Sequence, residues 1–306
     1  MSSASKRPLV VLGPTASGKS DVAMAYAAAH AGSEIIAVDA MQVYRRMDVG
    51  TAKPSAADKA AVRHQGIDLA EPSDDFAVTD FERAATAAIA DTVQRGGRPV
   101  LVAGTGLYLR SLTDPMEIPG RWPEIRLVLE VRAGAEGSAA LHRELAALDP
   151  VAASRMEPSN ERRVVRALEV TLGSDRPFSS FGPGINQYPP VEFEQVGLQW
   201  PRDVLTVRIA ERVHRMMAAG LLAEVEGLLG EPLPLSRSAR QALGYKELIE
   251  HLEGRVSLDE AVASVILRTR QFAVRQERWF RRDPRIRWVQ IEHDPVAEVL
   301  AVLQPT

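Results

Sequence analysis

Short, almost continuous apolar runs recur along the chain and are typical of strands buried on both faces of a parallel sheet. Glycine, proline or polar residues flank them, which favours strands over helices of this length. The runs lie at 8–12, 34–38, 98–103, 195–200 and 286–291. The sequence therefore predicts a parallel sheet assembled from both ends of the chain.

Between and after these strands, apolar residues recur with a helical period. The predicted helices cover 20–30, 79–94, 124–133, 138–148, 161–172, 204–229 and 258–281, with a break in the sixth at Gly220. Strands that alternate with helices give a sheet covered on both faces. We expect an α/β fold, a doubly wound parallel sheet of the phosphate-loop type, with a helical insertion domain.

The middle of the chain has no convincing strand pattern. From 113 to 190 helical stretches are separated by proline and glycine, and 178–190 has five such breakers, which makes it the best linker candidate. We predict a core domain from 1–112 and 191–306, and a helical insertion domain from 113–190.

The amino-acid composition excludes several kinds of chemistry. The 306 residues are 45% hydrophobic and 25% charged and include no cysteine, which excludes disulfides, thiol nucleophiles and cysteine-held metal. No apolar run approaches the ~18–20 residues that a membrane helix needs, and the polar first seven residues lack the features of a signal peptide. We expect a cytoplasmic protein with no membrane partner.

A phosphate-binding pattern follows the first strand. It is G-x-x-x-x-G-K-[ST], made of Gly13, Pro14, Thr15, Ala16, Ser17, Gly18, Lys19 and Ser20. Glycines let the backbone wrap a phosphate, Lys19 adds a cation, and the Ser20 hydroxyl can bind Mg²⁺. The pattern does not say whether the phosphate belongs to a nucleotide or to another diphosphate.

Polar residues also follow the second and third strands. Asp39 is placed to hold Mg²⁺ through water, to act as a general base, or to cap a turn, and Gln42 suits a nucleobase. Thr105 lies between two glycines after the third strand. Because ligands bind beyond the carboxyl ends of parallel strands, we expect these segments and the phosphate loop to share one crevice.

Arginine is concentrated near the C-terminus. Eight arginines lie between Arg268 and Arg287 against two acids, although the whole chain has a net charge of -3. Taken alone, this arginine-rich helix is explained equally well as a solvated, charged surface. In a chain that also has a phosphate loop, an RNA-binding surface is the favoured interpretation. A second candidate basic row consists of Arg162, Arg163 and Arg166, which taken alone is weak evidence for RNA binding.

Several segments together resemble the bacterial tRNA dimethylallyltransferases, or isopentenyltransferases. Besides the phosphate loop they are DAMQVY at 39–44, MDVGTAKP at 47–54, AGTGLY at 103–108, DPVAA at 149–153, RRVVRALE at 162–169, Gly244-Tyr245, Arg270-Gln271 and Arg275-Gln276. They occur in the family's order and cover nearly the whole chain. MDVGTAKP joined to DAMQVY is the most specific of them.

The resemblance implies transfer of a dimethylallyl group from dimethylallyl diphosphate to N6 of adenine 37 in tRNAs that read codons beginning with U. Lys19, Asp39 and Thr105 would be catalytic, with Asp39 as the base, and Mg²⁺ would bind at Ser20. The anticodon stem-loop of tRNA would contact Asp39, Ala40, Met41, Gln42, Thr105, Arg126, Arg162, Arg163, Arg166, Gly244, Tyr245, Arg275, Gln276, Arg278 and Arg281. We expect a monomer.

The chain departs from the family pattern at three positions. Ala40 stands where a serine is usual, Ala103 replaces the first glycine of its motif, and Arg46 replaces a common glycine. From residue chemistry alone, two other interpretations stay open. A small-molecule kinase would use ATP in the same loop, with 113–190 as a lid. A nucleotide-gated RNA-binding module would leave Asp39 and Thr105 without a task.

Overall fold

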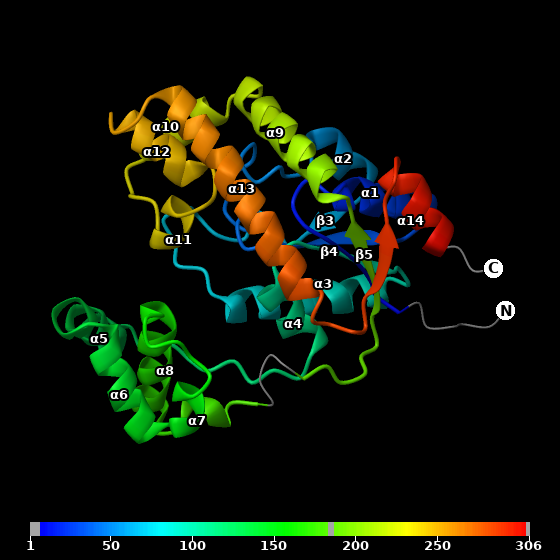
Figure 1. Cartoon of the computed structure of the whole chain (residues 1–306). Coiled ribbons are helices and arrows are strands. Elements are labelled where there is room, and N and C mark those ends of the chain that lie inside the picture. Colours follow the sequence, from blue (N-terminus) through cyan, green and yellow to red (C-terminus); the bar gives the residue numbers. More distant parts are fainter. Residues whose placement is uncertain (1–6, 183–186, 304–306) are drawn as a thin grey trace. The chain divides into compact units, whose positions relative to one another are not determined.

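The structure, a computed structural model, describes residues 7–182 and 187–303. The chain divides into two compact units. The first, the sheet unit, combines Met1–Thr113 with Pro190–Thr306, and the second, the helical unit, is Asp114–Pro189 (Figure 1). The first and last parts of the chain thus build one body.

The sheet unit is built on six strands that all run parallel in the described part of the chain. In spatial order they are β3 (His64–Gln65), β2 (Glu34–Val38), β4 (Pro99–Ala103), β1 (Leu9–Leu12), β5 (Glu194–Gln199) and β6 (Arg287–Gln290). β1 pairs with β4 on one side and with β5 on the other. The strand that follows the helical unit therefore lies inside the sheet, between β1 and β6.

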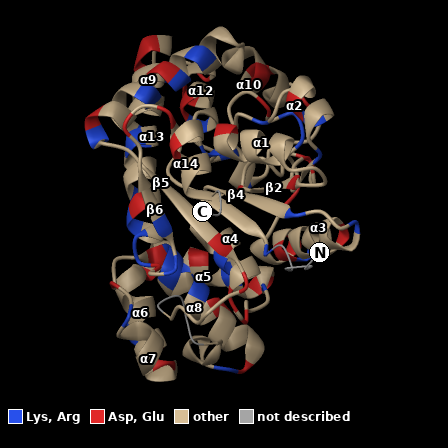
Figure 2. Ribbon diagram, turned by 90° about the vertical axis from the view of Figure 1, so that its right-hand side faces the viewer, with Lys and Arg blue, Asp and Glu red and all other residues tan. Residues whose placement is uncertain are grey.

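Alternate residues of β1, β2 and β4 enter two different hydrophobic cores. Leu9 and Val11 of β1 pack into a core formed with α1 (Lys19–Ala29) and α14 (Pro295–Leu303). Val10 and Leu12 pack into the opposite core, which includes α3 (Val78–Gln94) and α4 (Gly106–Thr113). The strands carry few charged residues, and most charges lie on helices and loops (Figure 2). This two-sided burial explains why the strands are apolar without alternation.

The remaining helices of the sheet unit continue these layers. They are α2 (Ala56–Ala61), α9 (Arg202–Ala218), α10 (Leu221–Leu229), α11 (Arg237–Arg240), α12 (Tyr245–Leu252) and α13 (Leu258–Phe280). α13 contacts α4, α9 and α12, so it spans the unit from its outer helices to the sheet end. α13 begins with a capping box between Ser257 and Glu260.

The helical unit has a small core of its own. Its elements are α5 (Pro123–Glu136), α6 (Ser138–Leu148), α7 (Pro150–Ala153), α8 (Glu161–Ser174) and the 3₁₀ turn η1 (Phe178–Ser180). Leu129, Leu141, Leu145 and Leu168 are fully buried between these helices. No strand occurs in the described part of this unit.

The fold confirms the α/β class predicted from the sequence and adds elements that were not predicted. The predicted break at Gly220 is present, with φ of +96° between α9 and α10. The short strand β3 and helices such as α4 and α12 were missed because their apolar patterns are too short. The predicted linker at 178–190 is wrong at its start, since Phe178 packs on the core of the helical unit. Residues 183–186 of that linker lie outside the described residues.

Among the described residues, no helix combines the length and the apolar character that crossing a membrane requires.

The packing of α4 on α13 leads to a stability prediction. A Cβ at Gly106 would lie 2.0 Å from the Trp279 ring, so Gly106→Ala must displace the indole or the helix. We expect a loss of about 1–3 kcal/mol in the free energy of unfolding, as for other overpacked sites. Urea unfolding measures it.

Gly227→Ala is the matched control, because this glycine lies inside α10 with no atom within 4 Å of an added Cβ. It should raise stability by up to about 1 kcal/mol. Equal stability changes for the two variants would contradict the close contact with Trp279.

Candidate active site

The phosphate loop has the strand, loop and helix context that its sequence predicts. It leaves β1 at Gly13 and enters α1 at Lys19. Gly18 has φ of +89°, and a Cβ there would lie 2.8 Å from Pro295 Cγ. A Cβ at Gly13 would lie 2.9 Å from Ser17 Oγ. Both glycines are therefore needed for this loop conformation.

Two carbonyl groups of the loop accept hydrogen bonds from side chains that follow the helical unit in the sequence. Trp200 Nε1 donates to Ser17 O at 2.8 Å, and Arg208 Nε donates to Ala16 O at 2.9 Å. The Arg208 guanidinium also lies over the Trp200 ring, 4.4 Å from its centroid. These contacts fix the loop from one side, and no motif in the sequence indicates them.

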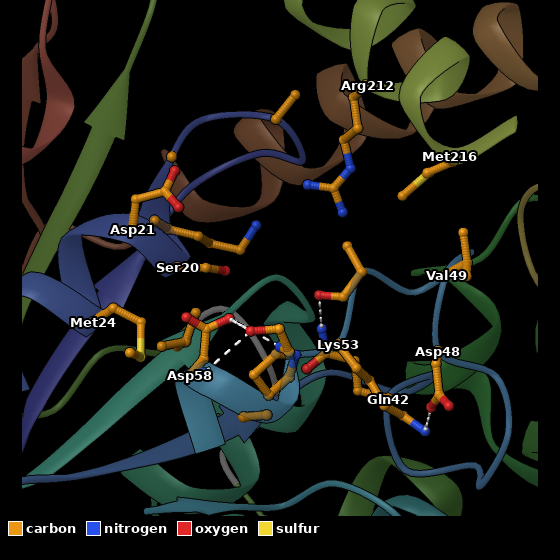
Figure 3. A pocket seen from close by; sticks show the side chains of 18 of the residues that line it. Ser20, Asp21, Met24, Gln42, Asp48, Val49, Lys53, Asp58, Arg212 and Met216 are labelled. Atoms are coloured by element: carbon orange, nitrogen blue, oxygen red, sulfur yellow. Dashed lines mark hydrogen bonds and ion pairs between the residues drawn. The ribbon is translucent and has the colours of Figure 1, made fainter. Parts of the chain in front are cut away.

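Two cations face one cleft beside the loop. Burial, reinforced by the nearby Arg212 guanidinium, lowers the pKa of Lys19 from 10.5 to about 8, although Asp39 and Asp21 oppose the change. Burial also lowers the pKa of Arg212, which extends from α9 into the cleft (Figure 3). An anion placed between them would relieve their repulsion, so the arrangement suits a diphosphate.

The segment after β2 is organised by Asp39. Its Oδ1 accepts the backbone N–H of Met41 at 2.8 Å and that of Gln42 at 3.3 Å. The Ala40 N–H donates to Thr105 Oγ1 at 3.3 Å, which joins the ends of β2 and β4. Ala40 therefore contributes to this turn through its backbone, which needs no serine side chain.

The three strand ends meet at Gly104. A Cβ at this residue would lie 3.5 Å from Asp39 Oδ2, 3.5 Å from Lys19 Cε and 3.3 Å from Gln276 Nε2. The Gln276 amide donates to Gly104 O at 2.7 Å and accepts from Thr15 N at 2.8 Å. The ends of the three strands are thus close together, and a residue of α13 lies among them.

The 47–54 segment is anchored by Glu224, a residue that the sequence patterns did not single out. The Glu224 carboxylate accepts backbone N–H groups of Asp48, Val49 and Gly50 at 2.7–3.1 Å. It also accepts the Tyr245 hydroxyl at 2.6 Å, and a Cβ at Gly50 would lie 2.5 Å from that ring. Tyr245 is fully buried, so its ring supports this segment from within.

The same segment orients Gln42 and contains a buried cation. Gln42 Nε2 donates to Thr51 O at 3.0 Å and to Ala52 O at 3.3 Å. Lys53, whose side chain is 1% exposed, is paired with Asp48 and Asp68. The motif of highest family specificity is therefore a tightly bonded support beside the cleft. Gly244, another residue that the resemblance assigns to tRNA, has φ of +90° and is the N-cap residue of α12.

The cleft has a volume of about 990 Å³ (Figure 3). The end of the phosphate loop, α1, α2, α9 and the 48–56 segment line it. Its wall is charged near Lys19 and Arg212, while Met24, Ile35 and Val102 add apolar surface. It can hold an anionic group together with a hydrocarbon or a base.

Ser20, the predicted Mg²⁺ ligand, is exposed and lines this cleft beside Asp21. The described residues contain no group of three or more His, Asp and Glu side chains that could hold a metal ion. Mg²⁺ commonly takes one or two protein ligands and completes its shell with substrate phosphates and water. A hydroxyl and a nearby carboxylate fit that mode.

Some of the arginines predicted to bind tRNA are exposed. Arg275 and Arg278 are exposed on α13, and Arg281, which caps the C-terminus of that helix, is exposed and paired with Glu277. In the helical unit, Arg162 and Arg163 are exposed. These side chains are available to a phosphate backbone, and their contact with tRNA stays a prediction.

Arg126 and Arg166 have partners inside the helical unit. Both are paired with Glu169, whose side chain is 1% exposed. Arg166 also donates to the carbonyls of Pro119 and Gly120. Both arginines therefore have a structural task, and any contact with tRNA would come in addition to it.

Arg208 and Arg212 were missed because nothing in the sequence links α9 to a loop nearly two hundred residues earlier. Their spacing of four, which places both on one face of α9, was the available signal. A phosphate loop, a carboxylate at the end of the next strand and an arginine from a distant helix define a phosphate-loop protein suited to a diphosphate-bearing substrate.

Comparisons with known proteins specify the family. The IPP transferase family profile matches residues 42–283, and the isopentenyl transferase profile matches 7–69. The tRNA dimethylallyltransferase of Geobacter metallireducens is 46% identical over 93% of this chain and 92% of its own. That of Pelotomaculum thermopropionicum is 42% identical over 98% and 96%. The chain belongs to the tRNA dimethylallyltransferase family.

Two solved structures are also similar to this chain over most of its length. The full-length tRNA isopentenylpyrophosphate transferase of Bacillus halodurans matches with a TM-score of 0.69 and 35% identity, over 97% of this chain and 94% of that one. A eukaryotic dimethylallyltransferase acting on tRNA has a TM-score of 0.77 at 24% identity, covering 94% of this chain and 74% of that one. The second likeness concerns the fold alone.

The site leads to a prediction about Lys19. A bound diphosphate should return the Lys19 pKa from about 8 towards its ordinary value of 10.5, so binding at about pH 9 should take up close to one proton. The affinity for dimethylallyl diphosphate should then fall as the pH rises above about 8, because the neutral amine loses the attraction. Titration calorimetry in two buffers of different ionisation enthalpy measures the uptake.

Lys19→Ala serves as the comparison for this measurement. It should bind the donor more weakly at pH 7, without proton uptake at the higher pH. If the wild type and Lys19→Ala take up the same number of protons on binding, a group other than Lys19 is the one that titrates.

Proposed function

We propose that this protein transfers the dimethylallyl group of dimethylallyl diphosphate to N6 of adenine 37 in tRNAs that read codons beginning with U. The observation that carries the proposal is the convergence of Lys19, Asp39 and Gln276 around Gly104. It brings a phosphate-binding loop and a carboxylate oxygen to one place. Family membership argues against the kinase and binding-module alternatives.

The phosphate loop would hold the leaving group. As the bond between the dimethylallyl carbon and the diphosphate oxygen breaks, the electron pair stays on the diphosphate. Lys19, Arg212 and the N-terminus of α1 would stabilise the charge that develops there. Mg²⁺ held at Ser20 would supply further charge neutralisation.

Asp39 would act as the base. The adenine amine forms the new bond to the dimethylallyl carbon and loses one proton, which an acceptor must take. Asp39 Oδ1 already accepts two N–H groups, whereas Oδ2 faces the Gly104 side near Lys19. The Thr105 hydroxyl holds the Ala40 N–H and so positions the Asp39 turn.

The anticodon stem-loop would bind through exposed arginines of both units. An adenine stacked in an RNA loop hides its amine, so position 37 must leave the stack to react. Gln42 would meet a neighbouring base through Oε1, since Nε2 is bonded to the 51–52 carbonyls. We propose a cytoplasmic monomer that meets tRNA there.

Asp39→Asn separates a base from a metal ligand. The amide oxygen can still cap the turn, but the proton acceptor is lost, so the chemical step should slow by ~10²–10⁴-fold with donor and tRNA affinities little changed. Single-turnover rates across a Mg²⁺ series are the measurement. Substantial recovery at high Mg²⁺ would move Asp39 to the metal site.

Arg275→Ala and Arg278→Ala test the RNA surface. Each should weaken tRNA binding and flatten its salt dependence by about one unit of slope for every phosphate that the variant no longer neutralises. Arg83→Ala is the control, since this arginine is exposed on α3 and its side chain pairs with Asp80. Salt titrations in which all three variants behave alike would remove α13 from the interface.

A further inference from the structure

The side chain of Gln276, on α13, bonds to two separate loops of the reaction centre. The residue is 7% exposed. Its Oε1 accepts the Thr15 N–H at 2.8 Å, and its Nε2 donates to Gly104 O at 2.7 Å. An amide from the C-terminal part of the chain therefore bridges two loops of its N-terminal part.

The two bonded groups belong to different tasks in the proposed reaction. Thr15 is in the loop that would hold the leaving diphosphate. Gly104 precedes Thr105, whose hydroxyl holds the Asp39 turn through the Ala40 N–H. The bridge thus connects the donor loop to the segment that places the base.

The bridge requires an amide of this length. Only a side chain with a donor and an acceptor can serve a backbone N–H and a backbone carbonyl at once. The helix that carries Gln276 is rigidly held, because its residues Thr269, Ala273 and Phe280 are buried in the fold. A rigid element holding a buried amide is suited to fix loop positions to a fraction of an ångström.

We propose that Gln276 is a positioning residue that sets the distance between the leaving diphosphate and the Asp39 carboxylate. The proposal rests on the proposed function. It gives Gln276 an inward task in place of the tRNA contact that the family resemblance implies. Arg275 and Arg278 beside it are exposed, so the same helix presents one set of residues outward and another to the reaction centre.

Gln276→Glu tests this with little change in size. The carboxylate can still accept from Thr15 but cannot donate to Gly104 O, so the bridge loses one end. Gln276→Asn keeps both groups but is one methylene too short to span them. Gln94→Glu, at the exposed end of α3, is the control for the same chemical change.

The measurements are single-turnover rates at saturating dimethylallyl diphosphate and tRNA, the affinity for each substrate, and the melting temperature, all on the full chain. We expect both Gln276 variants to lose ~10–100-fold in the saturated rate, as small misplacements of reacting groups do, while both affinities stay within about threefold. The control should match the wild type.

Two results would overturn the proposal. A raised tRNA dissociation constant with an unchanged saturated rate would make Gln276 an RNA contact, and a lowered melting temperature with an unchanged rate would make it merely structural. If Gln276→Glu does not fold, Gln276→Asn carries the same comparison. Absence of transfer by the wild type would instead reject the proposed function, before Gln276 is considered.

Discussion

The proposed reaction centre depends on the convergence of three distant parts of the chain at Gly104. At Gly104, three side chains from different parts of the chain come within 3.3–3.5 Å of where a Cβ would stand. Lys19 follows the first strand, Asp39 the second, and Gln276 belongs to a helix near the C-terminus. The proposed chemistry rests on this convergence, because it brings the cation of the donor loop close to the carboxylate.

The surroundings of that contact are polar and held by hydrogen bonds. Trp200 and Arg208 hold the phosphate loop, Thr105 holds the turn at Ala40, and Glu224 holds three successive N–H groups of the next segment. Preorganised groups of this kind stabilise developing charge without reorganising during the reaction. The bonds join distant parts of the sequence, which ties the activity to correct folding of the entire sheet unit.

The arginines of the helical unit differ in what they can contribute to recognition. Arg126 and Arg166 are used within the unit to neutralise the buried Glu169, while Arg162 and Arg163 are exposed. An arginine row found in a sequence therefore contains both structural and available cations. Burial of the partner carboxylate is what distinguishes them, because a buried charge must be paired.

The parallel α/β fold, the phosphate loop and the family could all be predicted from the sequence. Those features depend on local pattern: apolar runs, a glycine-rich motif, and short segments in a fixed order. Three other features became visible in the fold alone: Arg212 lies near Lys19, Glu224 anchors the 47–54 segment, and Gln276 turns inward. The members of each pair are far apart in the sequence, and no local period records which distant side chains a fold brings together.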